Sequence, residues 1–181
     1  MVSKLESLLK DVAVARKNFL DATAGLSEEQ ARFRPDELTW SVIDNVEHLF
    51  WAEFGGINGM WKVLEATRRQ QPVFTGERVH EGLPIEQVIE RTWKEKEQVP
   101  EIAKPKWGGP LAFWRNALES LQPQLARLAE AITEEELTSV IHPHPISGPI
   151  NVIQRFEFLR FHMNRHQGQV ERLRASANFP K

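Results

Sequence analysis

The sequence predicts an all-α fold with four long helices and a short additional helix between core helices two and three. Three observations favour this class. Apolar residues recur at helical spacing, alternating strand patterns are nearly absent, and stretches rich in proline and glycine separate the periodic segments. The chain has 181 residues, of which 41% are hydrophobic, so we expect one domain over residues 1–181.

The first half of the chain contains two predicted long helices. The first covers residues 3–24 and ends at Gly25, because glycine tolerates the left-handed closing turn. A capping-box pattern at Ser27 predicts a short helical turn, and a second one at Ser41 begins a helix that extends to about Arg69.

Three glycines, Gly55, Gly56 and Gly59, lie inside the second long helix. Glycine destabilises a helix interior, so these positions predict a close approach by another helix or by a ligand.

The second half of the chain contains two further long helices. A proline within the third can kink or divide it, and a proline in the first turn favours the start of the fourth. The predicted segments are a polar connection at 70–83, a short helix at 84–99, a loop at 100–110, a core helix at 111–132 containing Pro123, an extended loop at 142–145 and a last helix at 149–176 that begins at Pro149.

Composition excludes several functions. Lysine and arginine number 23 against 25 acidic residues, and the resulting charge of −2 disfavours nucleic-acid binding. The absence of cysteine excludes disulfides, thiolate metal sites and a cysteine nucleophile. The N-terminus lacks the pattern of a signal peptide and no apolar stretch is long enough for a bilayer, so we expect a cytoplasmic protein without a membrane partner.

Two histidines in the last predicted helix can bind one metal ion. His162 and His166 are four residues apart, so both rings project from one face, which also carries Leu159 and Leu173 and therefore points into the bundle. Two imidazoles at this spacing can share an ion. The spacing alone is also typical of a chance pair of half-buried histidines.

His48 lies at an inward position of the second long helix. A single histidine there is usually a core residue, but three histidines on two inward faces are harder to attribute to packing. Three neutral imidazoles that leave one coordination position open are typical of a catalytic site, because a structural zinc site is closed by four protein ligands. An open position can hold water or a thiolate.

The order of these motifs resembles the DinB/YfiT-like metalloenzyme superfamily over nearly the whole chain. The matching motifs are Trp40-Ser41, His48-Leu49, His144-Pro145 before Gly148, and His162-x-x-x-His166-x-x-Gln169. The resemblance implies a four-helix bundle with a crossover connection, with which the long 70–109 segment is compatible. It also implies that His48, His162 and His166 bind a divalent metal, with nickel or zinc favoured, and that a low-molecular-weight thiol is a cosubstrate.

Members of that superfamily include transferases and isomerases that use bacillithiol, mycothiol or glutathione, as well as proposed hydrolases. We therefore expect a metal-dependent enzyme that transfers a thiol to small electrophiles. The alternatives are a metal-dependent hydrolase of small amides or esters, and a non-catalytic stress-related binding protein with a vestigial site. The expected partner is a small-molecule substrate, and the expected assembly is a homodimer.

Other residues are weaker candidates, each with a structural interpretation that is at least as good. We expect turn stabilisation from His142 and His144, exposure of His80, and solvation of acidic residues that could otherwise orient His48. Tryptophans most simply fill the core, although two of them could wall a pocket. Arginines on the last helix are mostly solvated, although one or two could bind a carboxylate. The acidic residues are Asp44 and Glu53, the two candidate pocket walls are Trp51 and Trp107, and the arginines are Arg155, Arg160 and Arg165. Gln169 is a candidate hydrogen-bond partner of a ligating histidine.

Overall fold

The computed structural model describes residues 1–94 and 99–181 and confirms a mostly helical fold. Two short strands, β1 (Ile141–His144) and β2 (Gly148–Asn151), form a hairpin. The helices are α1 (Ser3–Ala22), α2 (Glu28–Arg32), α3 (Val42–Arg68), α4 (Ile85–Thr92), the 3₁₀ helix η1 (Glu101–Ala103), α5 (Leu111–Glu119), α6 (Leu121–Ala131), α7 (Glu136–Ser139) and α8 (Val152–Arg174).

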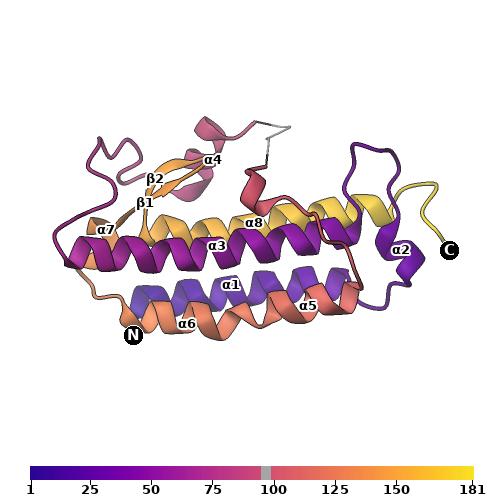
Figure 1. Cartoon of the computed structure of the whole chain (residues 1–181), viewed down its shortest axis with the longest axis horizontal. Coiled ribbons are helices and arrows are strands. Elements are labelled where there is room, and N and C mark those ends of the chain that lie inside the picture. Colours follow the sequence, from indigo (N-terminus) through magenta and orange to yellow (C-terminus); the bar gives the residue numbers. More distant parts are fainter. Residues whose placement is uncertain (95–98) are drawn as a thin grey trace.

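The long helices form a bundle in which α5 and α6 together make one of the four members (Figure 1). α1 packs against α8 and α6, while α3 packs against α5, α6 and α8. Their apolar faces share one core, with Phe19, Leu49, Leu64, Leu121 and Phe156 among its fully buried side chains. α3 and α8 are therefore neighbours, which brings together the two helices that carry the predicted metal ligands.

The segment between α3 and α5 runs from one end of the bundle to the other, so α3 and α5–α6 point in the same direction (Figure 1). α4 lies on this segment and packs its apolar side against β2 and α8, through a small cluster that includes Val88, Ile150 and Phe158. The predicted helix at 84–99 is shorter than expected, since α4 ends at Thr92 and residues 95–98 lie outside the described part.

Local signals in the sequence place most helix ends correctly. Ser27 and Ser41 each form the predicted capping box, and Gly25 adopts a φ of 69° after α1. The third core helix divides after Glu119, four residues before Pro123. Proline cannot donate to the carbonyl four residues earlier and its ring collides with that group, so the division follows from Pro123.

The segment around the two His-Pro pairs differs from the prediction. Residues 142–145 were expected to be extended loop, but residues 141–144 pair with 148–151 in an antiparallel hairpin. Pro149 therefore lies in β2 and does not begin the last helix, which starts after the N-cap Asn151. Gly148, with φ 70°, permits the tight turn, and Pro143 faces Pro149, which limits the ladder because neither has an N–H.

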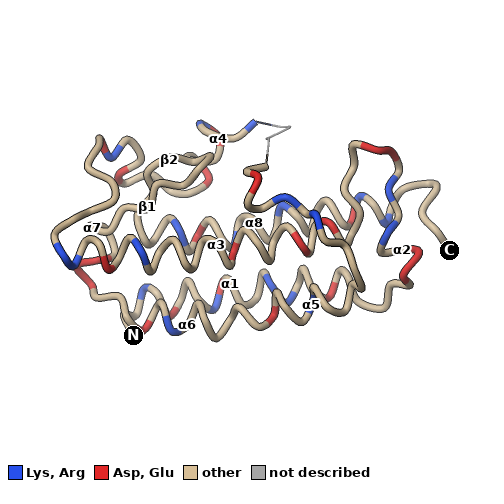
Figure 2. Tube along the Cα trace, viewed as in Figure 1, with Lys and Arg blue, Asp and Glu red and all other residues tan. Residues whose placement is uncertain are grey.

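Figure 2 shows positively and negatively charged residues interspersed along the helices. None of the described helices has the length and apolar character that a membrane span requires. The fold thus provides one internal core, with the charged residues distributed over the helices and the connecting segments.

Candidate metal centre

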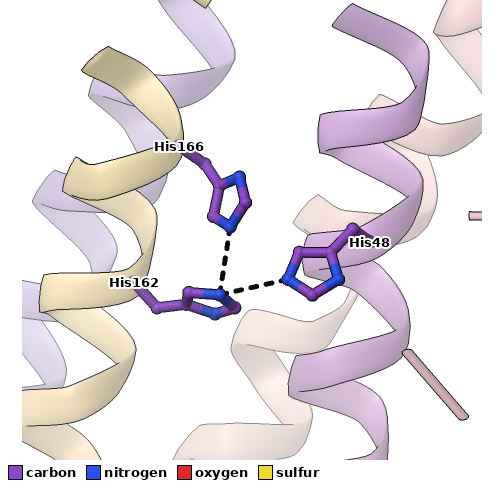
Figure 3. A group of neighbouring side chains, drawn as sticks. All are labelled: His48, His162 and His166. Atoms are coloured by element: carbon purple, nitrogen blue, oxygen red, sulfur yellow. Dashed lines mark hydrogen bonds between the residues drawn. The ribbon is translucent and has the colours of Figure 1, made fainter. Parts of the chain in front are cut away.

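His48, His162 and His166 converge between α3 and α8 (Figure 3). The Nε2 atom of His162 lies 3.1 Å from Nε2 of His48 and 3.1 Å from Nε2 of His166. One ring nitrogen from each residue lies within 4.8 Å of the other two, and the three side chains are 4%, 6% and 4% exposed, respectively. The predicted convergence of the three histidines is confirmed.

The second nitrogen of two of these rings is held by a carbonyl oxygen. His48 Nδ1 donates to the backbone oxygen of Ala103 at 2.7 Å, and His166 Nδ1 donates to Oδ1 of Asn45 at 2.7 Å. Asn45 in turn donates from Nδ2 to the backbone oxygen of Ser41 at 2.8 Å, which orients its amide. A carbonyl can only accept, so the proton of each ring is on Nδ1 and its Nε2 presents a lone pair.

These tautomers leave the centre short of protons. Nε2 of His48 and Nε2 of His166 both face Nε2 of His162 as acceptors, and one proton on His162 can satisfy only one of them. A cation shared by three lone pairs would satisfy all of them. Two nitrogens bonded to one tetrahedral ion at about 2.0–2.1 Å lie roughly 3.3 Å apart, close to the two observed separations. The donor set therefore fits a divalent metal such as zinc or nickel.

Burial keeps all three rings neutral. It lowers the pKa of His48 from 6.5 to about 4, although the hydrogen bond to Ala103 opposes the shift. It also places the pKa values of His162 and His166 well below their usual range, with neighbouring histidines adding to the effect and Gln169 opposing it at His166. Neutral imidazole is the form that binds metal, so the site is ready for a cation at neutral pH.

Aromatic rings surround the histidines. The Trp40 ring lies 4.9 Å from the ring of His48, and the Trp93 ring lies 5.9 Å from that of His162. Phe158, one turn before His162 on α8, lies 5.3 Å from it. These rings restrict water around the three nitrogens, which strengthens any electrostatic interaction made there.

The histidines line an open cleft with a volume of about 1570 Å³. That volume exceeds what a drug-sized ligand usually needs, so the cleft can hold a small cosubstrate together with a second molecule. Described residues from α3, α8, β1 and the segment before α5 form its walls, including Trp51, Ala103, His142, His144, Arg155, Arg165 and Gln169.

Glu47 anchors residues 103–108, the segment that lies over the site. Its fully buried carboxylate accepts hydrogen bonds from the backbone N–H groups of Lys106 at 2.7 Å, Trp107 at 2.8 Å and Gly108 at 2.9 Å. The same segment supplies the Ala103 carbonyl to His48. Two neighbouring residues of α3, Glu47 and His48, are therefore both hydrogen-bonded to this segment.

Comparison with known proteins identifies the family. The model of the DinB superfamily matches residues 12–170. The chain belongs to the DinB superfamily. It is also 24% identical over 164 residues to YuaE, an uncharacterized protein of Bacillus subtilis (strain 168), and the match covers 88% of this chain and 93% of YuaE. No solved structure matches the chain.

In this DinB-superfamily protein, the acidic residues predicted to be solvated or to orient His48 have other roles. Asp44 is buried in the first turn of α3, where it completes the capping box of Ser41, and it pairs with Arg34 at 2.7 Å. Glu53 is buried and forms an ion pair with Arg16. Neither prediction for these two carboxylates is correct, because both neutralise an arginine.

The remaining histidines have structural positions. His80, predicted to be exposed, is only 7% exposed, and its backbone oxygen accepts a hydrogen bond from Gln154. Nδ1 of His144 accepts from the backbone N–H of Ser147 at 3.0 Å, which confirms its predicted role in the turn. His142 and His144 also line the cleft, a position that the sequence did not indicate.

The tryptophans correct a second prediction. Trp114 is buried in the core, but Trp40, Trp51 and Trp93 are half-buried and line the cleft. Trp51 therefore is a pocket wall as predicted. Trp107 is 75% exposed and does not line the cleft, because its backbone faces Glu47 while its side chain points outward.

The three arginines of α8 have different surroundings. Arg160 pairs with Glu86 on the surface, as expected for a solvated helix face. Arg165 lines the cleft with its guanidinium carbon 5.4 Å from the Trp93 ring. Arg155 is only 3% exposed and lines the cleft, contrary to the expectation of a solvated side chain.

Two partners of the histidines were missed by sequence analysis. Asn45 precedes His48 by three residues and therefore shares its helix face, a spacing that could have indicated it. No sequence pattern could have indicated the Ala103 carbonyl, since every residue has a backbone carbonyl. Gln169, which was proposed as a partner of a ligating histidine, does lie beside His166.

Proposed function

We propose that this protein is a metal-dependent enzyme that transfers a small thiol to a small electrophilic substrate. His48, His162 and His166 are the proposed ligands of a divalent ion, with nickel or zinc favoured. The observation that carries the proposal is the convergence of three Nε2 atoms, because those of His48 and His166 both present a lone pair to that of His162, which can donate at most one proton. Membership of the DinB superfamily supports it, because that superfamily often binds metal.

A divalent ion bound by three neutral imidazoles would keep its full charge and would stabilise a thiolate at neutral pH. The chain's own residues set the conditions for this chemistry. Asn45 and Ala103 hold the ring nitrogens in the ligating tautomer, and Trp40, Trp93 and Phe158 limit access of water. The chain has no cysteine, so a thiol must enter the cleft as a small molecule.

A metal-dependent hydrolase is the competing enzyme. Hydrolysis commonly uses a carboxylate base beside the metal-activated water. Among the described residues that line the cleft, Asp36 is the only one with a carboxylate. Its oxygens already accept hydrogen bonds from the Leu38 backbone and the Thr39 hydroxyl. Thiol transfer requires no such base once the thiol is ionised, and the cleft therefore favours the transferase.

Cobalt substitution tests the proposal. We expect purified protein to take up about one Co²⁺ per chain, and added small thiols to produce a sulfur-to-cobalt charge-transfer absorption. His166→Ala should abolish the band, and the double variant His162→Ala/His166→Ala should lose cobalt uptake. Asn164→Ala is the matched control, because Asn164 is exposed between the two histidines on α8.

The outcomes separate the three functions. A thiol-dependent band with turnover of small electrophiles supports transfer. The absence of a band, together with ester or amide hydrolysis that rises with ionisation of bound water near pH 7, would identify a hydrolase. Cobalt uptake with neither activity would favour a non-catalytic binding protein. Equal uptake by the double variant would place the metal elsewhere and reject the assignment of the ligands.

A further inference from the structure

Arg155 is a buried cation in the wall of the cleft. It lies on α8 seven residues before His162, which corresponds to two helical turns and a rise of about 10 Å on the same face. Its side chain is 3% exposed, and its guanidinium carbon lies 5.1 Å from the centre of the Phe158 ring. Phe158 in turn contacts His162, so Arg155 and the candidate metal centre border a common space.

The facing helix leaves room for this side chain. A Cβ added at Gly56 of α3 would lie 1.7 Å from Nη2 of Arg155, a separation that no side chain can adopt. A Cβ at Gly59, one turn further, would lie 2.8 Å from Nε2 of His142. Gly56 and Gly59 weaken α3, but they let Arg155 and His142 pack against the helix backbone at the cleft.

The charges around Arg155 do not balance. Glu53 forms its ion pair with Arg16, and these two residues are 2% and 3% exposed. Arg155 is a second buried guanidinium, and it is attracted electrostatically to the same Glu53 carboxylate. Burial lowers its pKa only to about 10, so it remains charged at neutral pH. The buried group Arg16–Glu53–Arg155 therefore carries one net positive charge.

The guanidinium also has unused donors. Nε and Nη1 of Arg155 are buried and have no hydrogen-bond partner within the described residues, and the same is true of Nδ1 of His142. A buried charge without hydrogen bonds is costly and is normally paired with an anion or a ligand. Arg155 and His142 both line the cleft, so an anionic ligand there can reach these donors once the side chains turn toward it.

We propose that Arg155, with His142 beside it, forms an anion subsite that binds a carboxylate of the molecule whose reactive group sits at the three histidines. This inference rests on the proposed function for the role of the metal, but the subsite itself is defined by Arg155. A carboxylate fits because its two oxygens match the guanidinium fork and its single charge equals the excess charge of the site. The substrate class is accordingly a small carboxylic acid, either a thiol or its electrophilic acceptor.

Binding to the metal-free protein tests the subsite without any thiol chemistry. The probes are butyrate and its neutral counterpart butyramide, followed through the Nε–Hε resonance of Arg155, assigned through bonds in isotopically labelled protein. We expect butyrate to shift this resonance saturably and to bind at least tenfold more tightly than butyramide. No saturable shift, or equal affinity for the two probes, would overturn the proposal. Tighter binding of methyl phosphate than of butyrate would overturn the carboxylate assignment.

Paired variants separate the subsite from general charge and stability effects. Arg155→Met should abolish the preference for butyrate, and Arg160→Met should keep it, because Arg160 is paired with Glu86 on the surface of the same helix. Gly56→Ala should weaken butyrate at least tenfold by displacing the guanidinium, whereas Gly55→Ala, whose added Cβ meets nothing within 4 Å, should not. Retention of the preference in both Arg155→Met and Gly56→Ala would assign the anion to another cation of the cleft.

Cobalt-loaded protein distinguishes failure of the subsite from failure of the proposed function. Mercaptocarboxylic acids of increasing chain length are compared with mercaptoalcohols of equal length through the charge-transfer band. The acids should bind at least tenfold more tightly at one preferred length, and Arg155→Met should remove only this advantage. If no thiol produces a band while butyrate still binds Arg155, the thiol function fails and the subsite stands. A band without any advantage of the acids would reject the subsite alone.

Discussion

Asn45 determines which nitrogen of His166 faces the other two histidines. Its Oδ1 accepts the Nδ1 proton at 2.7 Å, and its Nδ2 is committed to the backbone oxygen of Ser41, so the amide cannot turn without losing both bonds. Hydrogen bonds of this kind fix the tautomer of a ligating histidine and raise its basicity. Asn45 is therefore a positioning residue of the centre, because it acts through the His166 ring.

Asn45→Ala should lower zinc affinity by about 10–100-fold, as loss of such a partner does at other metal sites. The reason is that His166 loses the acceptor that holds its proton on Nδ1. Competition with a chromophoric chelator measures the affinity. Asn45→Asp, which keeps an acceptor, should recover most of it.

Asn58→Ala is the control, because Asn58 is exposed on the same helix and donates to the backbone oxygen of Phe54. An Asn45→Ala protein with unchanged zinc affinity would show that the His166 tautomer needs no such support. Equal loss in both variants would indicate a general effect on α3.

At the scale of elements, α3 anchors the segment between η1 and α5. Three successive backbone N–H groups, from Lys106 to Gly108, converge on the Glu47 carboxylate, and charge-assisted bonds of this kind are stronger than neutral ones. Arg32 adds a bond to the oxygen of Gly109 at 3.1 Å. Because this segment directly follows Ala103, the last residue of η1, its order and that of His48 are connected.

Glu47→Gln should loosen the segment while leaving the bundle folded, since an amide has one oxygen where the carboxylate has two and lacks its charge. We expect amide hydrogen exchange at Lys106, Trp107 and Gly108 to accelerate at least tenfold, which corresponds to about 1.4 kcal/mol of local stability. Exchange within α1 should not change.

Glu65→Gln provides the comparison, because Glu65 is an exposed acidic residue of α3 paired with Arg68 and Arg69. If exchange in the 106–108 segment were unchanged by Glu47→Gln but slow in both proteins, other contacts would hold the segment.

At the scale of the whole molecule, the fold lowers the pKa of five of the six imidazoles. Burial lowers the pKa of His48 to about 4 and of His142 to about 3, with Arg155 adding to the effect at His142. His144, His162 and His166 shift in the same direction. The unfolded chain protonates these groups near pH 6.5, whereas the folded metal-free chain does not.

Stability of the metal-free protein should therefore fall as the pH drops below 6.5. The folded pKa values lie below the unfolded value, so the contribution is fully present above pH 6.5 and is lost as the pH falls toward the folded values. His48 alone should remove on the order of 2 kcal/mol of unfolding free energy between pH 7 and pH 5. Urea denaturation in the presence of a chelator, at both pH values, measures the change.

The His48→Gln variant isolates that contribution, because its unfolding free energy should depend less steeply on pH than that of the wild type. This comparison of slopes holds whatever the absolute stability of the variant. Glu53 acts in the opposite direction, since burial raises its pKa, but it contributes equally to both proteins. A wild-type protein equally stable at pH 7 and pH 5 would contradict neutral burial of the histidines.

Local patterns in the sequence determined the helices and two of the three histidines of the centre. Periodic apolar residues indicated the bundle members, capping residues indicated their starts, and Pro123 indicated a division, because each of these signals acts within a few residues. The i, i+4 spacing alone placed His162 and His166 on one face. His48 joined them through its inward position on the second long helix, and the resemblance to the superfamily supported the set. The small-molecule substrate and the homodimer stay predictions.

Tertiary structure decided everything that depends on residues distant in the chain. His48 and His162 are 114 residues apart, and only the packing of α3 on α8 brings their nitrogens together. The Ala103 carbonyl, the burial of Arg155 against Gly56 and the roles of Glu47 and Glu53 arise in the same way. Such contacts produce no periodic pattern in a sequence, because the residues that surround a buried charge come from distant parts of the chain. Residues close in the chain determine local geometry, whereas the pairing of buried charges and the orientation of the histidine rings arise only when the helices pack.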